Sequence, residues 1–303
     1  MSITISIIIP VYNNPQGLKD TISSLVIQNY PFDKYEVIIA DNGSIDNTKD
    51  IAKEYAGEYP QLVKYVVEDK IQSSYAARNK GIKAAKGNLI CFLDANVTVE
   101  TDFLSKAILW FQRNKVDYLG CNVKMKMIYK TLTSKYNYLF GFDIQTAIKD
   151  HKYTPTCCLI IRQTVIEKVG NFDSRLEGGG DFEFGERVSE ADFCMDYAKD
   201  IIVYHPTRWK YLSLINKSKR VCRGNAELAY YYPNKYKYLF SRHFIIKNFL
   251  PRNPIKFYRV LNDKGIQVSM LTTLLFPFYH IPIQLAGTIA AIKRAKVLRE
   301  TGK

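Results

Sequence analysis

The chain has 303 residues, of which 47% are hydrophobic, so it is long enough for one large domain or a domain with an appendage. It contains no low-complexity segment or repeat, which favours a globular protein. Its six cysteines form no C-x-x-C pair and lie mostly in apolar stretches. We therefore expect reduced, buried thiols in a cytosolic protein and no zinc site. No basic segment with a cleavage site precedes the first predicted strand, so no signal peptide is expected.

The formal net charge of +14 is distributed unevenly along the chain. Residues 205–264 contain fourteen Lys or Arg and many aromatic residues, against two acids, Glu227 and Asp263. Residues 266–292 contain no Asp, Glu, Lys or Arg, and a second basic cluster follows at 293–296. Basic and aromatic residues that flank an apolar segment are typical of proteins that bind an anionic membrane surface. The alternative is a solvated basic face with a core helix. No nucleic-acid-binding module is recognised, so nucleic acid is not an expected partner.

The first hundred residues alternate predicted strands and helices. Strands are expected at 3–9, 36–40, 63–67 and 89–93, and helices after Pro15, after Asp46 and at 73–86. This order predicts an α/β fold with a mostly parallel sheet and right-handed crossovers. There is no G-x-G-x-x-G after the first strand and no G-x-x-x-x-G-K-[ST], which argues against a dinucleotide oxidoreductase or a P-loop enzyme.

The rest of the chain carries weaker signals. A helix is expected at 102–113, a strand at 116–125, an amphipathic segment to residue 150, a strand at 156–161, a helix at 164–169 and a strand at 201–204. Three glycines, 178–180, predict a mobile approach to a helix that begins near Asp181. Pro277 and Pro282 predict a break in the apolar segment, which favours two helices in the membrane interface over one straight span.

Polar side chains follow three of the predicted strands. Tyr12 and Asn13 follow the first strand, Asp41 follows the second, and Asp94 and Asn96 follow the fourth. In open α/β sheets, ligands bind beyond the carboxyl ends of the strands. Oxygen ligands at positions i and i+2 of a strand point the same way and can bind one hard cation such as Mg²⁺ or Mn²⁺, which in turn holds a diphosphate. The alternative is that Asp94 and Asn96 are ordinary turn residues.

Short motifs occur in a fixed order along the chain: Pro10-Val11-Tyr12-Asn13, Asp41-Asn42-Gly43-Ser44, Ala77-Arg78-Asn79-Lys80-Gly81, Phe92-Leu93-Asp94-Ala95-Asn96, Gly180-Asp181-Phe182-Glu183 and His205-Pro206. Together they resemble the family-2 glycosyltransferases, inverting enzymes of the GT-A fold, of the bacterial cell-surface or exopolysaccharide type. The resemblance covers roughly the first 210 residues. It implies a GT-A domain at 1–210, with a nucleotide-binding half at 1–97 and an acceptor half at 98–210. Residues 211–303 are then a helical, basic, membrane-associating region.

The resemblance also implies an activity, the transfer of a sugar from a nucleotide-diphosphate sugar, expected to be a UDP-sugar, to a saccharide or lipid-linked acceptor. It places the enzyme in the cytoplasm, at the inner face of the cell membrane. The implied nucleotide-sugar contacts are Pro10, Tyr12, Asn13, Asp41, Ser44, Arg78 and Asp94. The implied site for Mn²⁺ or Mg²⁺ comprises Asp94, Asn96 and His205. Asp181 is the implied general base, with Glu183 as the second candidate.

Two departures from the family pattern bear on this interpretation. The family commonly has Asp-x-Asp where this chain has Asp94-Ala95-Asn96, and a neutral amide holds a metal more weakly than a carboxylate. The family often has Gly-Glu-Asp-x-Glu, whereas here Gly180 precedes Asp181, so the base is kept and its acidic neighbour is lost. These departures leave open a non-catalytic, membrane-associated nucleotide-sugar-binding protein. A nucleotidyltransferase is a weaker alternative, because residues 10–17 contain no Lys or Arg.

Overall fold

The computed structural model describes residues 4–251, 253–263 and 265–302, so Ile3, the first residue of a predicted strand, lies outside the described residues. The chain divides into two compact units. Unit 1 comprises Met1–Lys124, Phe142–Arg175 and Gly180–His205. Unit 2 comprises Met125–Gly141, Leu176–Gly179 and Pro206–Lys303. The domain boundaries expected at residues 97 and 210 stay predictions.

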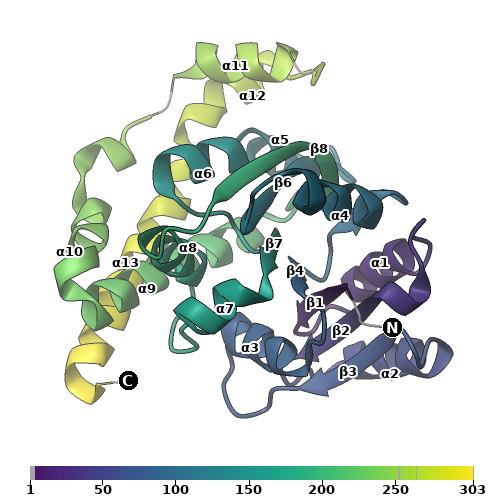
Figure 1. Ribbon diagram of the computed structural model, residues 1–303. Coiled ribbons are helices and arrows are strands. Elements are labelled where there is room, and N and C mark those ends of the chain that lie inside the picture. Colours follow the sequence, from purple (N-terminus) through teal and green to yellow (C-terminus); the bar gives the residue numbers. More distant parts are fainter. Residues whose placement is uncertain (1–3, 252, 264, 303) are drawn as a thin grey trace. The chain divides into compact units, whose positions relative to one another are not determined.

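The fold of unit 1 is built on an eight-stranded sheet in the order β3-β2-β1-β4-β7-β6-β8-β5 (Figure 1). β3, β2, β1 and β4 are parallel, whereas β7 runs antiparallel to both β4 and β6, and β5 to β8. The mixed sheet flanked by helices confirms the expected α/β, GT-A-like fold. The strands are β1 Ile5–Val11, β2 Tyr35–Asp41, β3 Val63–Val67, β4 Leu89–Leu93, β5 Thr98–Val99, β6 Tyr118–Lys126, β7 Cys158–Arg162 and β8 Met195–Pro206.

Helices cover both faces of the parallel strands. Leu18, Ile22 and Leu25 recur at helical spacing on α1 and are buried in the core that includes the inner side chains of β1. On the other face, Gly81 of α3 lies so close to Ile8 that an added Cβ would be 2.4 Å from it. The helices are α1 Pro15–Leu25, α2 Thr48–Glu58, α3 Ser74–Ala84, α4 Phe103–Arg113, α6 Ile144–His151, α7 Gln163–Val169 and α8 Gly180–Glu190, with a short 3-10 helix η1 at Phe32–Lys34.

Local signals set where these helices begin. The Asn14 side chain accepts a hydrogen bond from the Gly17 amide and Pro15 is the first residue of α1, as the sequence predicted. Ser73 caps α3 through the Tyr75 amide. The helix predicted at 73–86 is shorter in the structure, because α3 already ends at Ala84. Gly87 instead packs against β1, where an added Cβ would lie 2.6 Å from the Ser6 nitrogen.

Other sequence expectations need correction. The strand expected at 201–204 is part of a longer strand, β8, whose first six residues include only one buried residue and gave no alternating pattern. The amphipathic segment before residue 150 forms two helices, α5 and α6. Five cysteines are buried as expected, but Cys194 is exposed in the turn before β8.

Unit 2 is helical. Its long helices α9 and α13 lie side by side (Figure 1). Gly287 of α13 allows this approach, because an added Cβ would be 2.5 Å from Ser218 Oγ and 2.6 Å from Cys222 Sγ of α9. The helices are α5 Leu132–Leu139, α9 Tyr211–Tyr231, α10 Pro233–Ser241, α11 Pro254–Asp263, α12 Met270–Leu275 and α13 His280–Thr301, with 3-10 helices η2 Arg242–Phe244, η3 Ile246–Phe249 and η4 Phe276–Phe278.

A buried carboxylate joins the two long helices of unit 2. Glu227 of α9 is fully buried, and its Oε1 accepts a hydrogen bond of 2.7 Å from Arg294 Nε of α13. Its Oε2 accepts the Glu177 amide at 2.7 Å. Burial raises the pKa of Glu227, although both partners act in the opposite direction. Arg294, which belongs to the basic cluster at 293–296, is therefore bound within the fold.

The apolar segment of unit 2 is interrupted where the sequence predicted. α12 ends at Leu275, and Pro277 lies in the 3-10 helix that leads to α13. Pro282 does not break the helix, because it lies in the first turn of α13, where no amide is needed for a helical hydrogen bond. Residues Leu271–Thr301 are long and apolar enough to cross a membrane, but 39% of their most apolar window is buried inside the protein, and core helices meet the same criteria.

Candidate active site

The carboxyl ends of β1 and β2 lie side by side in unit 1. Val11 pairs with Asp41 in the parallel register, and Pro10 is a buried strand residue one position earlier. Tyr12 follows the strand with its side chain 46% exposed. Asn13 adopts a left-handed conformation (φ 47°), which asparagine tolerates better than most residues.

Asn13 is tied to the segment that follows β2. Its amide donates to Ser44 Oγ at 3.0 Å, and its side-chain oxygen accepts from the Ile45 amide at 2.9 Å. The structure thus brings together Asn13 and Ser44, which are 31 residues apart in the chain. Asn13 directly follows Tyr12 in the chain, and its contact with Ser44 forms one edge of the candidate site.

Asp41 is buried at this edge and each of its oxygens has a partner. Oδ1 accepts from the Ser44 amide at 2.9 Å, and Oδ2 accepts from the Tyr65 hydroxyl at 2.8 Å. Burial, and then this hydrogen bond, raise the pKa of Tyr65 above its ordinary value. A carboxylate has about four lone-pair sites, so Asp41 can still accept a bond from a ligand.

Asp94 is paired with an arginine of α3. Arg78 Nη2 lies 2.8 Å from Asp94 Oδ1, and the arginine is 4% exposed. Arg78 is therefore a buried partner of a carboxylate and not a solvated surface residue. Its Nε is buried without a hydrogen-bond partner among the described residues, so the guanidinium retains a free donor.

Asp94 and Asn96 belong to a turn and not to the end of β4. The strand stops at Leu93, and the amides of Asn96 and Val97 both bond to the Asp94 carbonyl. The strand rule of alternating side chains therefore does not apply to this pair, because the chain reverses direction here. Asn96 Oδ1 is buried and has no hydrogen-bond partner among the described residues. An unpaired buried oxygen is costly unless a ligand or ion satisfies it, so this atom fits a metal site.

α1 packs closely on the same turn. The Asn14 side chain donates to the Ala95 carbonyl at 2.6 Å, and a Cβ added to Gly17 would be only 2.2 Å from that carbonyl oxygen. This contact fixes the backbone between Asp94 and Asn96.

Asp181 is the second residue of α8, close to where the sequence placed it. Its Oδ1 accepts from the Tyr75 hydroxyl at 2.8 Å and from Thr156 Oγ1 at 3.3 Å, and its Oδ2 accepts from the Thr156 amide at 3.4 Å. Neither Tyr75 nor Thr156 was expected at the site. Tyr75 has a signal in hindsight, since it lies three residues before Arg78 on one helix face.

The glycines before Asp181 are packed, which differs from the expected mobile approach. Gly178 lies against Gly224 of unit 2, where an added Cβ on Gly224 would be 2.3 Å from the Gly178 carbonyl oxygen. Gly179 has a φ of +77°, a conformation that favours glycine. A Cβ on Gly180 would meet the Tyr75 ring. Close contacts and backbone conformation explain why these positions are glycines, and the expected mobility stays a prediction.

Glu183 has a different environment from Asp181. It is 3% exposed, and its two oxygens accept from Arg187 at 2.6 and 2.9 Å. Arg187 also donates to the Asn171 carbonyl. This pair holds α8 to the segment after α7, so Glu183 is less available than Asp181 to accept a substrate proton.

Asp94 and Asp181 both influence the pKa of one buried thiol, that of Cys157. Burial raises the pKa of Cys157 well above its ordinary value, and the negative charges of Asp94 and then Asp181 raise it further. Arg78 acts in the opposite direction on the same group. Both carboxylates therefore lie within electrostatic range of one buried atom, and both are held from one helix, α3.

His205 lies near the end of β8 and is 6% exposed. Its ring packs 5.1 Å from the Phe142 ring. Tyr204 pairs with Thr98 in the antiparallel register, and continuing this register brings His205 beside the turn that contains Asn96. Within the described part of the chain, no three His, Cys, Asp or Glu residues group as metal ligands. The predicted metal site has only two residues of these four types, Asp94 and His205, and its third ligand is the side-chain amide of Asn96.

Comparisons with known proteins identify the family of the chain. A family model described as glycosyl transferase family 2 matches residues 6–170. The chain is 32% identical over 267 residues to glycosyltransferase AglE of Haloferax volcanii, covering 88% of this chain and 87% of that protein.

Two solved structures share the fold. One is the mannosyltransferase PcManGT from Pyrobaculum calidifontis in complex with GDP-Man and Mn²⁺, with a TM-score of 0.60, 18% identity and coverage of 100% of this chain and 88% of that one. The other is residues 1–349 of S. aureus TarS in complex with UDP-GlcNAc, with a TM-score of 0.57, 18% identity and coverage of 98% and 92%. By its sequence, the chain belongs to glycosyltransferase family 2.

Proposed function

We propose that this glycosyltransferase moves a sugar from a nucleotide-diphosphate sugar to an acceptor hydroxyl with inversion at the anomeric carbon. The observation that carries this proposal is the pair of carboxylates held from α3. Arg78 binds Asp94, and Tyr75 binds Asp181, from one face of the helix. One carboxylate beside the donor and a second beside the acceptor are what a single in-line displacement requires.

In this reaction the acceptor hydroxyl oxygen forms a bond to the anomeric carbon while the bond from that carbon to the diphosphate breaks. Asp181 accepts the hydroxyl proton as the new bond forms. Asp181 is preferred over Glu183 because Arg187 occupies both oxygens of Glu183. The ends of β1 and β2 bind the nucleotide: Tyr12 offers an exposed ring for stacking, and Asp41 can accept from a ring N–H. Pro10, Asn13 and Ser44 shape this edge.

Asp94, Asn96 and His205 would hold Mn²⁺ or Mg²⁺. The unpaired Asn96 oxygen supports this assignment, and a structural relative is described in complex with Mn²⁺. Oxygen ligands suit both cations, and an imidazole suits Mn²⁺ better. A bound cation would supply positive charge to the leaving diphosphate. Arg78 shares the charge of Asp94, so we expect the site to bind the cation weakly in the absence of nucleotide.

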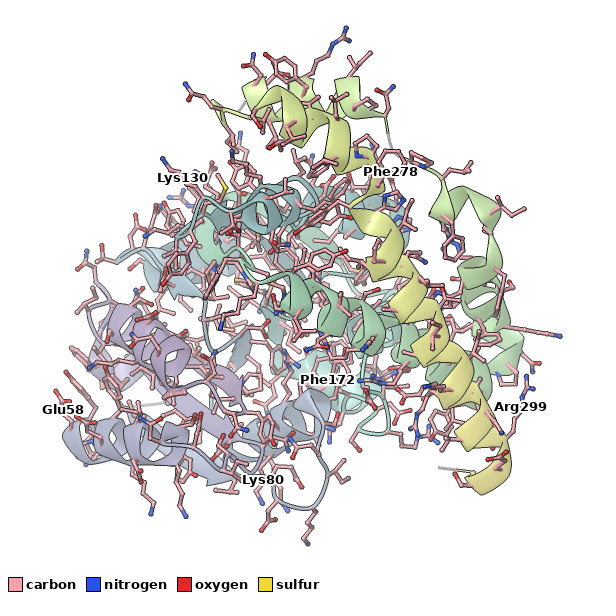
Figure 2. All side chains as sticks on the ribbon, turned by 180° about the vertical axis from the view of Figure 1, so that it is seen from behind. Glu58, Lys80, Lys130, Phe172, Phe278 and Arg299 are labelled. Atoms are coloured by element: carbon pink, nitrogen blue, oxygen red, sulfur yellow. The ribbon has the colours of Figure 1, made fainter. Side chains whose placement is uncertain are left out.

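Residues 211–303 are proposed to bind an anionic membrane surface at the cytoplasmic face of the cell membrane. The support lies in unit 2, where exposed apolar side chains gather around the junction of α12 and α13: Leu271, Leu274, Leu275 and Phe278 (Figure 2 labels Phe278). Arg259 is exposed on α11, which contacts α12, and Arg242 is exposed on η2 of the same unit. Apolar insertion and basic residues together are the two signals that a stable interfacial association needs. The acceptor is then a saccharide or a lipid-linked molecule near the membrane.

Ligand-induced stabilisation tests the proposed function. UDP, GDP, CDP and dTDP are added to the full chain with and without Mn²⁺, and the melting midpoint is measured. A ligand that binds only the folded state stabilises it, by about 2.7 kcal/mol at a hundredfold excess over Kd, and this stabilisation raises the melting midpoint. We expect one nucleotide, UDP first, to act in a Mn²⁺-dependent manner. Release of that nucleotide from its sugar conjugate then separates an enzyme from a non-catalytic binding protein.

A further inference from the structure

Tyr75 and Gly180 form a matched pair beside the proposed base. The Tyr75 ring is 2% exposed and stacks on Phe172 with ring centroids 5.8 Å apart (Figure 2 labels Phe172). Its hydroxyl accepts a hydrogen bond from the Gly180 amide at 3.0 Å and donates to Asp181 Oδ1 at 2.8 Å. Because the hydroxyl accepts on one side, its single proton is directed to the carboxylate on the other.

We propose that Tyr75 is a positioning residue for Asp181, and that residue 180 is a glycine because the Tyr75 ring occupies the space of its side chain. A Cβ built on Gly180 would lie 2.7, 2.8 and 2.9 Å from three ring atoms of Tyr75. Real Cβ atoms do not approach other atoms this closely, so any larger residue must displace the ring. The family often has an acidic residue at the position of Gly180. In this chain the group beside Asp181 is instead the neutral hydroxyl of Tyr75 from α3.

The hydrogen bonds also distinguish the two carboxylate oxygens. Oδ1 receives the hydroxyls of Tyr75 and Thr156. Among the described residues, Oδ2 receives only the Thr156 amide, at a long 3.4 Å. The less engaged oxygen is the better proton acceptor, so Oδ2 is the atom that takes the acceptor proton. Tyr75 fixes the carboxylate in the orientation that exposes it.

The pH dependence of this arrangement depends on the groups that face Asp181. These are Tyr75 of α3, Tyr118 of β6, and Tyr153 and Cys157 before β7, while Glu183 on its own helix is bound by Arg187. Burial raises the pKa of Tyr118, Tyr153 and Cys157, so these groups stay neutral at and below neutral pH. A change in the acidic limb of the rate profile therefore reports on a carboxylate.

The inference rests on the proposed role of Asp181, and Tyr75→Phe tests it. This variant keeps the ring and removes the hydroxyl. We expect kcat for release of nucleoside diphosphate from UDP-GlcNAc or GDP-mannose to fall roughly 10- to 100-fold, as for the loss of a hydrogen bond to a charged group. Nucleotide binding should stay unchanged. The acidic limb of kcat/KM should move to higher pH, because the ionised carboxylate has lost a donor.

Two further measurements make the test decisive. Tyr35→Phe, which removes a buried hydroxyl bonded to the Leu25 carbonyl, is the matched control and should leave the pH profile unchanged. A ¹³C titration of the Asp181 carboxyl, assigned with Asp181→Asn, should show a higher midpoint in Tyr75→Phe and needs no turnover. An unchanged profile and an unchanged midpoint would overturn the positioning role.

A double-mutant cycle tests whether the Tyr75 ring is what requires a glycine at position 180. Gly180→Ala should reduce kcat about as much as Tyr75→Phe, and this loss should disappear in the Tyr75→Ala background, where the ring is absent. An equal cost of Gly180→Ala in both backgrounds would refute the proposed pair. If Asp181→Asn turned over normally, the proposed role of Asp181 as the base, on which this inference rests, would fail. Loss of turnover in Asp181→Asn together with normal turnover in Tyr75→Phe would refute only the positioning role of Tyr75.

Discussion

The two units hold their charged side chains in opposite ways. In unit 1 the proposed metal ligand Asp94 and the proposed base Asp181 are only partly buried. Arg78 binds one oxygen of Asp94, and Asp181 is held by Tyr75 and Thr156, with only one long hydrogen bond to its Oδ2 among the described residues. In unit 2 a single buried carboxylate, Glu227, is fully enclosed and bonded through both oxygens.

This difference distinguishes carboxylates that serve the proposed active site from a carboxylate that stabilises the fold. A partly exposed carboxylate can still bind a ligand through its remaining lone pairs, whereas a fully enclosed carboxylate that is paired with a cation can only stabilise the fold. Site carboxylates should therefore respond to substitution in turnover and binding. Glu227 and its partner should respond in stability. The following predictions test this contrast.

The largest expected effect is that of Asp181→Asn. Asparagine keeps the size and accepts the Tyr75 hydrogen bond, but cannot take a proton at neutral pH. Turnover should fall by roughly two to four orders of magnitude, typical of the loss of a general base, while UDP or GDP binding should barely change. Asp20→Asn, an exposed aspartate bonded to Gln16, is the matched control. Normal turnover in Asp181→Asn together with a dead Glu183→Gln would move the base to Glu183.

Arg294→Met should have the largest effect on stability. It leaves Glu227 buried without its cation, which costs about 3–5 kcal/mol for a buried pair. Because burial raises the folded-state pKa of Glu227, its protonated form contributes stability that is fully present below the unfolded pKa and lost as pH rises through the raised one. Urea unfolding should therefore show a larger loss at pH 8 than at pH 5. Nucleotide binding should persist in the folded protein.

Lys296→Met is the matched control for this prediction, since Lys296 and Glu300 form an exposed pair at 3.8 Å. Exposed pairs contribute little, so its unfolding free energy should change by less than about 0.5 kcal/mol. An equal loss in both variants would show that Glu227 is not a structural carboxylate.

The metal site is tested by Asp94 and Asn96. Asp94→Ala should abolish Mn²⁺-dependent nucleotide binding, but it also strands the buried Arg78, so Asp94→Asn is the cleaner companion. Asn96→Asp adds a charge to the site and should lower the Mn²⁺ concentration that gives a half-maximal UDP-induced melting shift by roughly tenfold. Unchanged Mn²⁺ dependence in all three variants would remove this turn from the metal site.

The smallest expected effect concerns the exposed apolar residues of unit 2. Deleting residues from 265 onward would remove α13 and uncover Glu227, so substitutions are the sharper test. Replacing Leu271, Leu274 and Phe278 by Ser should weaken binding to phosphatidylserine-containing vesicles roughly 10- to 100-fold. Leu109→Ser, at an exposed leucine of α4 in unit 1, is the control. A wild-type chain that does not bind these vesicles at low salt contradicts the membrane proposal.

The sequence predicted the parallel half of unit 1 well, because its signals are local. Asn14 and Pro15 mark the start of α1, and an uninterrupted apolar run marks β4. The partners of the site residues could not be predicted. Tyr75 and Asp181 are 106 residues apart, and only the folded chain brings them together. In unit 2 the composition indicated apolar and basic surface, but not that Arg294 is bound to Glu227.

The central claim is a single displacement assisted by Asp181, and the configuration of the first-formed product tests it most directly. The nucleotide sugar that stabilises the chain, such as UDP-GlcNAc with its α-linked sugar, is hydrolysed by the enzyme and followed by ¹H NMR before mutarotation. One displacement inverts the anomeric centre, whereas two successive displacements retain it. We expect the β-anomer to appear first, and its rate of appearance to collapse in Asp181→Asn. First appearance of the α-anomer would contradict the account.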